Sequence, residues 1–244
     1  MAREFYSSNE SLRRDEAVVS SPPFTFAGWV YLNSITAGVI CGVYYSASTG
    51  NWHSLRYAST PQTFRAESRS VDTYYAQTTT TYGTGSWIHV AGVWASNSNR
   101  KIYSEGNLED TNTTSCTPSN LNRTSLGIHG DSSPSMDLDG RLAEVAIWDA
   151  ALNDDEIAIL AKGYSPLFIR PQNLKAYWPL IRKGASVDNP DFVGGFNLSD
   201  VNTPEDAEHC RIIHPAGPIV CGISGGGGLK VSVLAEHYRK MRVA

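Results

Sequence analysis

Hydrophobic side chains recur along this chain with the two-residue period of β-strands. The clearest runs are residues 24–32, 86–94 and 141–148, where large apolar or aromatic side chains stand at both odd and even positions. Successive side chains of a strand point to opposite faces of its sheet. Apolar residues at both parities therefore predict strands that are covered on both faces and lie centrally in a sheet. Weaker alternation predicts further strands at residues 38–45, 52–57, 63–68, 101–104, 124–128 and 174–180.

The segments between these runs are rich in Gly, Asn, Ser and Thr, as at residues 95–100 and 130–136. Short strands joined by such turn-forming segments are typical of antiparallel sheets that pack in pairs. The pattern predicts an all-β fold, a two-sheet antiparallel sandwich.

One short helix is predicted after residue 153. Asn153 can serve as its N-cap, and Glu156 stands three residues later, which is the spacing of a capping box. Gly163 can adopt the left-handed conformation that ends a helix. The expected buried stripe of this helix is Ile157, Leu160 and Ala161.

The sequence after residue 165 differs from the rest in its high proline content. Seven prolines fall within residues 166–222, and proline cannot donate to a strand ladder, so extended pieces that wrap the sandwich are expected. The predicted organisation is a sandwich over residues 1–165, an extended segment that completes it over 166–221, a Gly-rich linker over 222–228 and a basic tail over 229–244.

The tail has the spacing of an amphipathic helix. Apolar residues recur at intervals of three, four and three, and four basic residues against one glutamate give it a charge of +3. Two interpretations stay open: a helix that folds back on its own domain, or an arm that docks on an acidic partner. The candidate docking residues are Leu234, Tyr238, Arg239, Met241 and Arg242.

Composition and charge narrow the function classes. The 244-residue chain carries a formal charge of -4 and has no apolar run near 20 residues, so neither a nucleic-acid partner nor a membrane span is expected. The N-terminus has no apolar core of a signal peptide, which predicts synthesis in the cytoplasm. The widely spaced cysteines predict reduced, packed thiols rather than a zinc site; they are Cys41, Cys116, Cys210 and Cys221.

Several motifs in order make the chain resemble a laminin-G-like, concanavalin A-like lectin/glucanase domain over about residues 5–165. They are FTFAGWV at 24–30, GSWIHVAGVW at 85–94, IYSEG at 102–106, SLG at 125–127 and DLDGRLAEVAIWDAALNDDEI at 137–157. The last is the most specific, because a closing strand runs directly into the capped helix. The resemblance implies a jelly-roll fold.

The flanking segments resemble a subset of these domains that tailed bacteriophages encode. They are SNESLRRDEAVVSSPPFTF before the first long strand, and SPLFIRPQNLKAYWPL and DFVGGFNLSD after the helix. This resemblance implies a virion protein located on the virion surface, either a capsid decoration or an adhesion module. As part of the same hypothesis we expect a homo-oligomer.

The tryptophans fall inside strand-like runs, where large aromatics dominate the core of a sandwich. We therefore expect core positions for Trp29, Trp87, Trp94 and Trp148. Trp178 is expected to end a further strand and to cover a sheet edge.

No catalytic constellation is found. The Glu-x-Asp-x-Glu run that resemblance associates with related β-glucanases is absent, and Asp137, Asp139 and Glu144 have the wrong spacing for one strand face. There is no GxSxG motif, and the histidines are scattered; His89 is expected in the core. The sequence predicts that the protein is not an enzyme.

Calcium is the ion that the resemblance implies. Asp131, Asp137 and Asp139 precede the closing strand and could offer oxygen ligands. The alternative, which we favour, is a polar loop whose carboxylates cap turns. No cofactor is required by either interpretation.

A saccharide site is the sharper hypothesis. Aromatic faces stack on sugar rings while neighbouring polar groups orient the hydroxyls. The candidates are Tyr44, Tyr45, Trp52, Tyr57, Tyr74 and Tyr75, with Arg65, Arg69 and Asp72 among them. The same residue types also suit strands and protein interfaces.

The leading hypothesis is thus a non-enzymatic virion structural protein whose partners are capsid or other virion proteins. The alternative is a lectin-like adhesion module, associated with a tail or fibre, that binds host or environmental polysaccharide. A glucanase-like enzyme ranks last.

Overall fold

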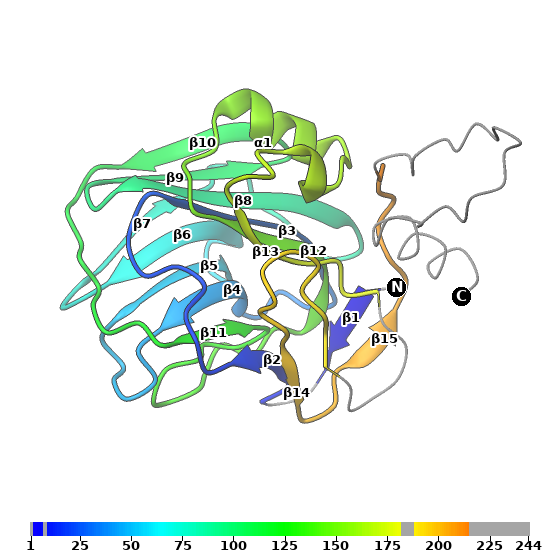
Figure 1. Cartoon of the computed structure of the whole chain (residues 1–244), viewed down its shortest axis with the longest axis horizontal. Coiled ribbons are helices and arrows are strands. Elements are labelled where there is room, and N and C mark those ends of the chain that lie inside the picture. Colours follow the sequence, from blue (N-terminus) through cyan, green and yellow to red (C-terminus); the bar gives the residue numbers. More distant parts are fainter. Residues whose placement is uncertain (1, 7–8, 182–187, 215–244) are drawn as a thin grey trace, which may run out of the picture.

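The computed structural model describes residues 2–6, 9–181 and 188–214 and shows two antiparallel sheets packed face to face (Figure 1). Sheet A has eight strands in the spatial order β10-β9-β8-β3-β12-β1-β15, and β13 also pairs with β12. Sheet B has seven strands in the order β14-β2-β11-β4-β5-β6-β7. The predicted all-β fold is confirmed: the described residues form a jelly-roll sandwich with one short α-helix.

The strands of sheet A are β1 (Ala2–Phe5), β3 (Phe24–Leu32), β8 (Trp87–Ser96), β9 (Asn99–Ser104), β10 (Asn107–Asn112), β12 (Gly140–Trp148), β13 (Leu174–Trp178) and β15 (Glu205–Ala207). Those of sheet B are β2 (Ser11–Arg14), β4 (Gly38–Tyr44), β5 (Trp52–Ala58), β6 (Thr63–Arg69), β7 (Thr73–Gln77), β11 (Arg123–Leu126) and β14 (Ser199–Val201). The helices are α1 (Asp154–Ala161) and the short 3₁₀ helix η1 (Pro166–Phe168).

The three strongest strand patterns give the centre of sheet A. β3 lies between β8 and β12, so all three are paired on both sides, as apolar residues at both parities predict. The pattern missed β1, β2, β7, β10, β14 and β15. These strands are short or polar, and backbone pairing with a neighbour, rather than their own side chains, makes them strands.

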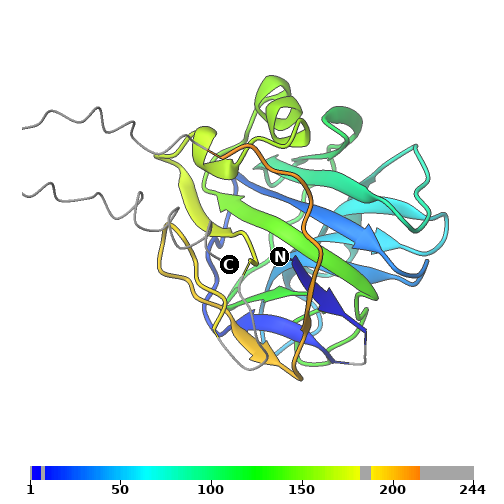
Figure 2. The same cartoon turned by 90° about the vertical axis from the view of Figure 1, so that its right-hand side faces the viewer.

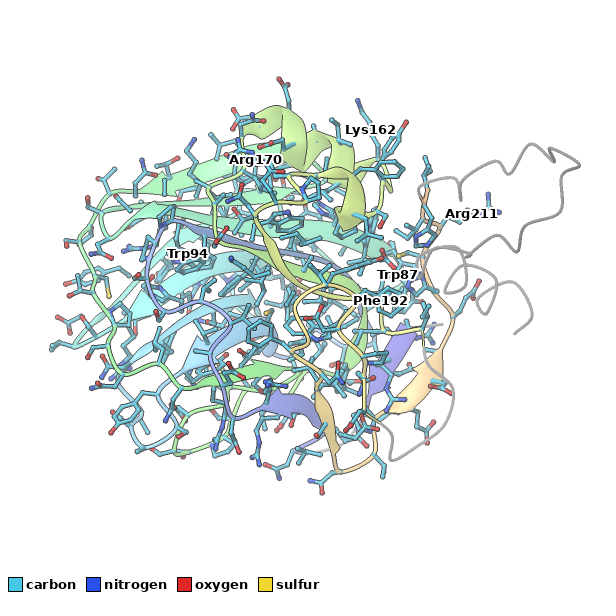
Figure 3. All side chains as sticks on the ribbon, in the orientation of Figure 1. Trp87, Trp94, Lys162, Arg170, Phe192 and Arg211 are labelled. Carbon is cyan, nitrogen blue, oxygen red and sulfur yellow. The ribbon has the colours of Figure 1, made fainter. Side chains whose placement is uncertain are left out.

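The main core fills the space between the two sheets. Phe24 stacks on both Phe26 and Trp94 with ring centroids 4.9 Å apart, and the Trp94 indole donates to Ser68 Oγ at 2.8 Å. Figure 3 shows Trp94 and Trp87 near opposite ends of the same strand. Trp94, Trp148 and Trp178 are fully buried, as expected.

A second apolar cluster lies on the outer face of sheet A, under α1. Ile157 and Leu160 of the helix pack there with Trp148. The predicted capping box is present: Asn153 accepts from the Glu156 backbone at 2.9 Å, and Glu156 accepts from the Asn153 backbone at 2.8 Å. Gly163 has φ +85°, the left-handed conformation expected there.

The segment after α1 contributes to both sheets. Its strands β13 and β15 join sheet A and β14 joins sheet B, and residues 208–214 then run across the outer face of sheet A toward α1 (Figure 2). Arg3 of β1 ties this segment to the N-terminus through Asp200 at 2.6 Å and Asp206 at 3.0 Å. Within the described ranges, no helix has the length and apolar character to cross a membrane.

Two tryptophans are not core residues. Trp29 and Trp87 are half-buried on the outer face of sheet A, beyond the part that α1 covers. Strand parity gives the reason: Trp29 stands at the odd positions of β3, whereas the inner face takes Phe24, Phe26 and Val30. The prediction of core positions was wrong for these two residues.

Candidate functional site

The structure separates the six candidate aromatic residues according to strand parity. Tyr44, Trp52 and Tyr75 stand at outer-face positions of sheet B, whereas Tyr57 and Tyr74 stand at inner-face positions, opposite Phe64 and Ser68. Tyr45 follows the end of β4 and is half-buried. Sequence proximity alone had grouped residues that the sheet directs to different faces.

Burial excludes three of the rings from stacking on a ligand. Tyr44 is 0% exposed and Trp52 is 4% exposed, because the loop of residues 127–139 covers them. The His129 ring of this loop packs edge-on against both, at 4.6 Å and 4.8 Å between ring centroids. Tyr57 is fully buried between the sheets, where it packs on Phe64.

Tyr75 is the candidate that combines an outer-face position with an exposed ring. It is 38% exposed, and the Arg65 guanidinium lies over its ring, 4.2 Å from the centroid. Arg65 is itself fixed by Gln77, whose amide oxygen accepts from Arg65 Nε at 2.6 Å. The ring and the guanidinium are therefore held in place before any ligand arrives.

The neighbours of Tyr75 on the same face form a polar cluster, which we call the β5–β7 face. Its residues are Arg56, Arg65, Glu67, Arg69, Tyr75 and Gln77, which share the outer parity of β5, β6 and β7. Glu67 stands directly opposite Tyr75, and Arg65 stands directly opposite both Arg56 and Gln77.

One carboxylate serves the arginines of the β5–β7 face. Glu67 Oε1 lies 2.6 Å from Arg56 Nη2 and 3.7 Å from Arg65 Nη1, and Glu67 is 1% exposed. Three guanidinium groups and one carboxylate leave this face with two positive charges. Guanidinium groups offer planar donor sets that fit carboxylate, sulfate and hydroxyl acceptors.

Unpartnered polar atoms lie beside the β5–β7 face. In the described part of the chain, the hydroxyls of Tyr44, Ser54 and Ser125 are buried without a hydrogen-bond partner. Ser125 and Ser54 flank Gly42 as its cross-strand partners. The Tyr44 ring lies so close to Gly42 that a Cβ there would collide with it, so the three hydroxyl-bearing residues surround this glycine. Burial raises the pKa of Tyr44 well above its usual value, so its phenol stays protonated.

The three candidate calcium ligands do not converge. Asp131 contacts His129 Nδ1 at 3.2 Å and accepts from the Ser133 backbone at 2.8 Å. Asp137 accepts from the Asn9 backbone at 2.9 Å, and the Asp139 carbonyl accepts from the Asn33 backbone at 3.0 Å. Across residues 2–6, 9–181 and 188–214, no three His, Cys, Asp or Glu side chains gather as a metal site needs. In the described structure, the carboxyl groups of Asp131 and Asp137 and the backbone carbonyl of Asp139 instead make separate contacts around the loop, as in the polar-loop alternative.

The predicted docking residues Leu234, Tyr238, Arg239, Met241 and Arg242 lie outside the described residues, as does Cys221. Cys41, Cys116 and Cys210 are free thiols, as expected.

Sequence reasoning missed an aromatic row on the outer face of sheet A. Tyr31 of β3 stands opposite Trp87 of β8, with 5.8 Å between the ring centroids. The guanidinium of Arg141 in β12 lies over the Tyr31 ring, 4.7 Å from its centroid. Glu4 of β1 accepts from Arg141 at 2.9 Å and from the Asn33 side chain at 3.0 Å. The signal was present in the sequence, because each of these positions has the parity opposite to the core.

This fold agrees with the comparison of the sequence to known families. Residues 7–158, more than half of the chain, match a laminin-G family described as the concanavalin A-like lectin/glucanases superfamily. The chain belongs to the concanavalin A-like lectin/glucanase superfamily. Among curated proteins, none matches the sequence.

Solved structures of the superfamily fold share little sequence with this chain. A putative carbohydrate-binding protein from Bacteroides ovatus aligns with a TM-score of 0.59 and 16% identity, over 86% of this chain and 61% of that protein. The CBM40 module of Ruminococcus gnavus IT-sialidase, bound to α2,3-sialyllactose, gives 0.56 and 14%, over 66% and 98%. Domain 4 of an extracellular arabinanase from Geobacillus stearothermophilus, in complex with arabinotriose, gives 0.51 and 23%, over 61% and 71%. This chain therefore spans about three fifths of the Bacteroides protein, and these likenesses establish the fold.

Proposed function

We propose that this protein is a non-catalytic, lectin-like module that binds saccharides on the β5–β7 face. The observation that carries the proposal is Tyr75: of the six aromatic candidates, it alone has an exposed ring at an outer-face position, beside an arginine that is already fixed. The carbohydrate-binding proteins that share the fold support a role of this class.

The chemistry of the β5–β7 face suits a sugar. The apolar face of a pyranose can stack on the Tyr75 ring, and hydroxyl groups at its edge can accept from guanidinium donors. Arg65 and Gln77 are joined by a hydrogen bond at 2.6 Å, so ordering them adds little entropic cost to binding.

The same face is poorly suited to glycoside hydrolysis. That reaction uses two carboxyl groups about 5 to 10 Å apart, one of which donates a proton. The β5–β7 face holds one carboxylate, Glu67, and Arg56 lies 2.6 Å from it. A face with a single carboxylate does not offer the pair of carboxyl groups that this reaction uses.

Attachment to a virus particle, homo-oligomeric assembly and a place on the virion surface stay predictions from the resemblance to phage-encoded domains. The carbohydrate-binding relatives in fold favour the lectin-like alternative over the capsid decoration role.

The proposal is tested by glycan-array binding, followed by calorimetry with the strongest ligand, for the wild type and two variants. Tyr75→Ala removes the exposed ring and should weaken binding by about tenfold, which corresponds to about 1.4 kcal/mol. Tyr164→Ala is the matched control, since Tyr164 is 37% exposed and lies after α1; its affinity should equal that of the wild type. A silent array, or equal affinity for Tyr75→Ala and the wild type, would contradict the proposal.

A further inference from the structure

The charge of the β5–β7 face identifies a class of saccharide. Building on the proposed function, we infer that this face selects saccharides that carry a carboxylate or sulfate group, and that the arginines of the face bind this anionic group. The inference rests on strand register, on the pairing of each charged group and on the contrast with the other sheet.

Strand register places like charges against each other. Arg56 of β5 and Arg65 of β6 are direct cross-strand partners, and like charges in this position are destabilising unless they are compensated. Arg69 stands on the same face of β6, opposite Trp52 and Thr73. Three cations are thus built into neighbouring positions of one surface.

The carboxylate on this face, Glu67, is already paired with two of the arginines. The contacts of Glu67 to Arg56 Nη2 at 2.6 Å and to Arg65 Nη1 at 3.7 Å use the same oxygen, Oε1. One negative charge cannot neutralise three guanidinium groups. Nε of Arg56 and Nε of Arg69 are buried without a hydrogen-bond partner in the described part of the chain, and a buried donor without a partner is unfavourable.

Two other acidic groups near this face are occupied at their own positions, and Asp72 lies exposed in the turn between β6 and β7. Asp110 of β10 accepts from the backbone N–H of Gln77 at 3.0 Å. Asp131 in the covering loop contacts His129 at 3.2 Å. A bound carboxylate or sulfate would therefore supply the negative charge that this face lacks, and its oxygens would accept from the free guanidinium donors.

The position of Tyr75 links this anion site to a sugar. The Arg65 guanidinium lies 4.2 Å from the Tyr75 ring centroid, so a sugar ring stacked at Tyr75 has its edge beside a cation. An acidic substituent on that sugar would reach the arginines without a second binding site. A neutral sugar would gain the stacking contact and leave the charges uncompensated.

The outer face of sheet A shows that an arginine over a tyrosine does not by itself create such a site. Arg141 lies over Tyr31 in the same way, but Glu4 pairs with it one to one and Asn33 adds a further donor to the same carboxylate. No positive charge is left over in that pair. Arg141 therefore provides a matched control for the arginines of the β5–β7 face.

The experiment compares a glycan array that contains carboxylated, sulfated and neutral saccharides with calorimetry on one matched pair, an oligogalacturonate and its methyl ester. We expect the array to favour acidic saccharides. In calorimetry, the methyl ester should bind at least tenfold more weakly than the oligogalacturonate, and added salt should weaken binding of the oligogalacturonate at least tenfold. Hits confined to neutral saccharides would overturn this inference and leave the proposed function standing. An array without hits would overturn the proposed function and this inference with it.

Variants assign the effect to the arginines. Arg69→Gln should weaken binding of the best acidic ligand at least tenfold and leave its neutral counterpart unchanged, whereas Arg141→Gln should alter neither. Arg65→Gln provides a second test if Arg69→Gln unfolds, as thermal unfolding would reveal. Equal weakening of acidic and neutral ligands by a folded arginine variant would overturn the inference. Inorganic sulfate, titrated by NMR, should shift amide signals of β5 to β7 in the wild type and less in Arg69→Gln; shifts of equal size would also overturn it.

Discussion

The outer faces of the two sheets contain the same kinds of residue in different charge ratios. On sheet A, Arg141 lies over Tyr31 and is matched by Glu4. On sheet B, Arg65 lies over Tyr75, but Glu67 is shared with Arg56, and Arg69 stands on the same face of β6. The first arrangement is neutral and the second is cationic. The number of carboxylates, rather than the presence of an aromatic and an arginine, distinguishes the candidate binding face.

The two outer faces also differ in what covers them. Helix α1 packs on one part of sheet A, and residues 208–214 cross another part (Figure 2). On sheet B the loop of residues 127–139 covers Tyr44 and Trp52, whereas Tyr75, two strands further on, stays exposed. The covering loop thus removes two of the six aromatic candidates from the surface, and strand parity turns Tyr57 and Tyr74 to the inner face.

The largest expected effect comes from removal of the shared carboxylate. Glu67→Gln leaves the cross-strand partners Arg56 and Arg65 without their counter-charge and should lower the free energy of unfolding by about 3 kcal/mol, because it breaks a buried ion pair. Glu4→Gln should cost about 1 to 2 kcal/mol, since Arg141 is more exposed and can be hydrated. Urea denaturation of both variants measures the difference.

Added sulfate sharpens this comparison. Sulfate should restore more stability to Glu67→Gln than to Glu4→Gln, because it can occupy the cationic face. Equal costs for the two substitutions, with equal responses to sulfate, would show that the two faces are electrostatically alike.

A smaller effect is expected from the histidine that holds residues 208–214 against sheet A. His209 donates from Nδ1 to the Cys210 carbonyl at 2.7 Å and from Nε2 to the Pro179 carbonyl at 3.0 Å, and Nε2 lies 3.3 Å from Glu144 Oε1. Burial opposes its charged form, but the hydrogen bond and the charge of Glu144 outweigh burial and raise the pKa of His209 above its usual value.

The sign of the pH dependence follows from this raised pKa. The stabilisation is complete below the pKa of an unfolded histidine, about 6.5, and is lost as the pH rises through the higher folded pKa. The unfolding free energy of the wild type minus that of His209→Gln should therefore fall as the pH rises above about 6.5. This difference cancels the contributions of His53 and His89, whose pKa values burial lowers to about 3. A difference that rises instead would refute the assignment.

The smallest effect is expected at the aromatic row of sheet A. Trp87→Ala removes a half-buried ring that packs edge-on against Tyr31, and should cost about 1 kcal/mol of stability. Saccharide binding should not change, because the proposed site lies on the other sheet. Loss of binding by a folded Trp87→Ala protein would transfer the site to sheet A, and calorimetry on this variant decides between the two faces.

Local signals were the most informative part of the sequence. The capping box of Asn153 and Glu156 and the left-handed Gly163 involve neighbours within one helix, so spacing alone predicted them. The long apolar strands were also predicted from their own residues, because burial on both faces excludes polar residues from them. By contrast, β10 reads NLEDTN, and only its pairing with β9 makes it a strand.

The candidate site was predicted in part. The sequence indicated the region of β4 to β7 and named Tyr75 and Arg65, but it grouped Tyr75 with Tyr74, which faces the opposite side. It also could not foresee that His129, from a distant loop, covers Tyr44 and Trp52, since contacts between segments far apart in the chain leave no local periodic signal.

The sequence by itself determined the fold class and helix α1, because these follow from the alternation of side chains along single strands and from spacing within one turn of helix. It also determined the superfamily, through motifs that match those of the family over residues 7–158. The tertiary structure alone decided which charged groups share a surface. Arg56, Arg65 and Glu67 meet through the register of β5 and β6, whereas Arg141 meets Glu4 from the far end of the chain. Coulomb interactions depend on distance in space, and that distance is set by strand pairing rather than by position in the sequence.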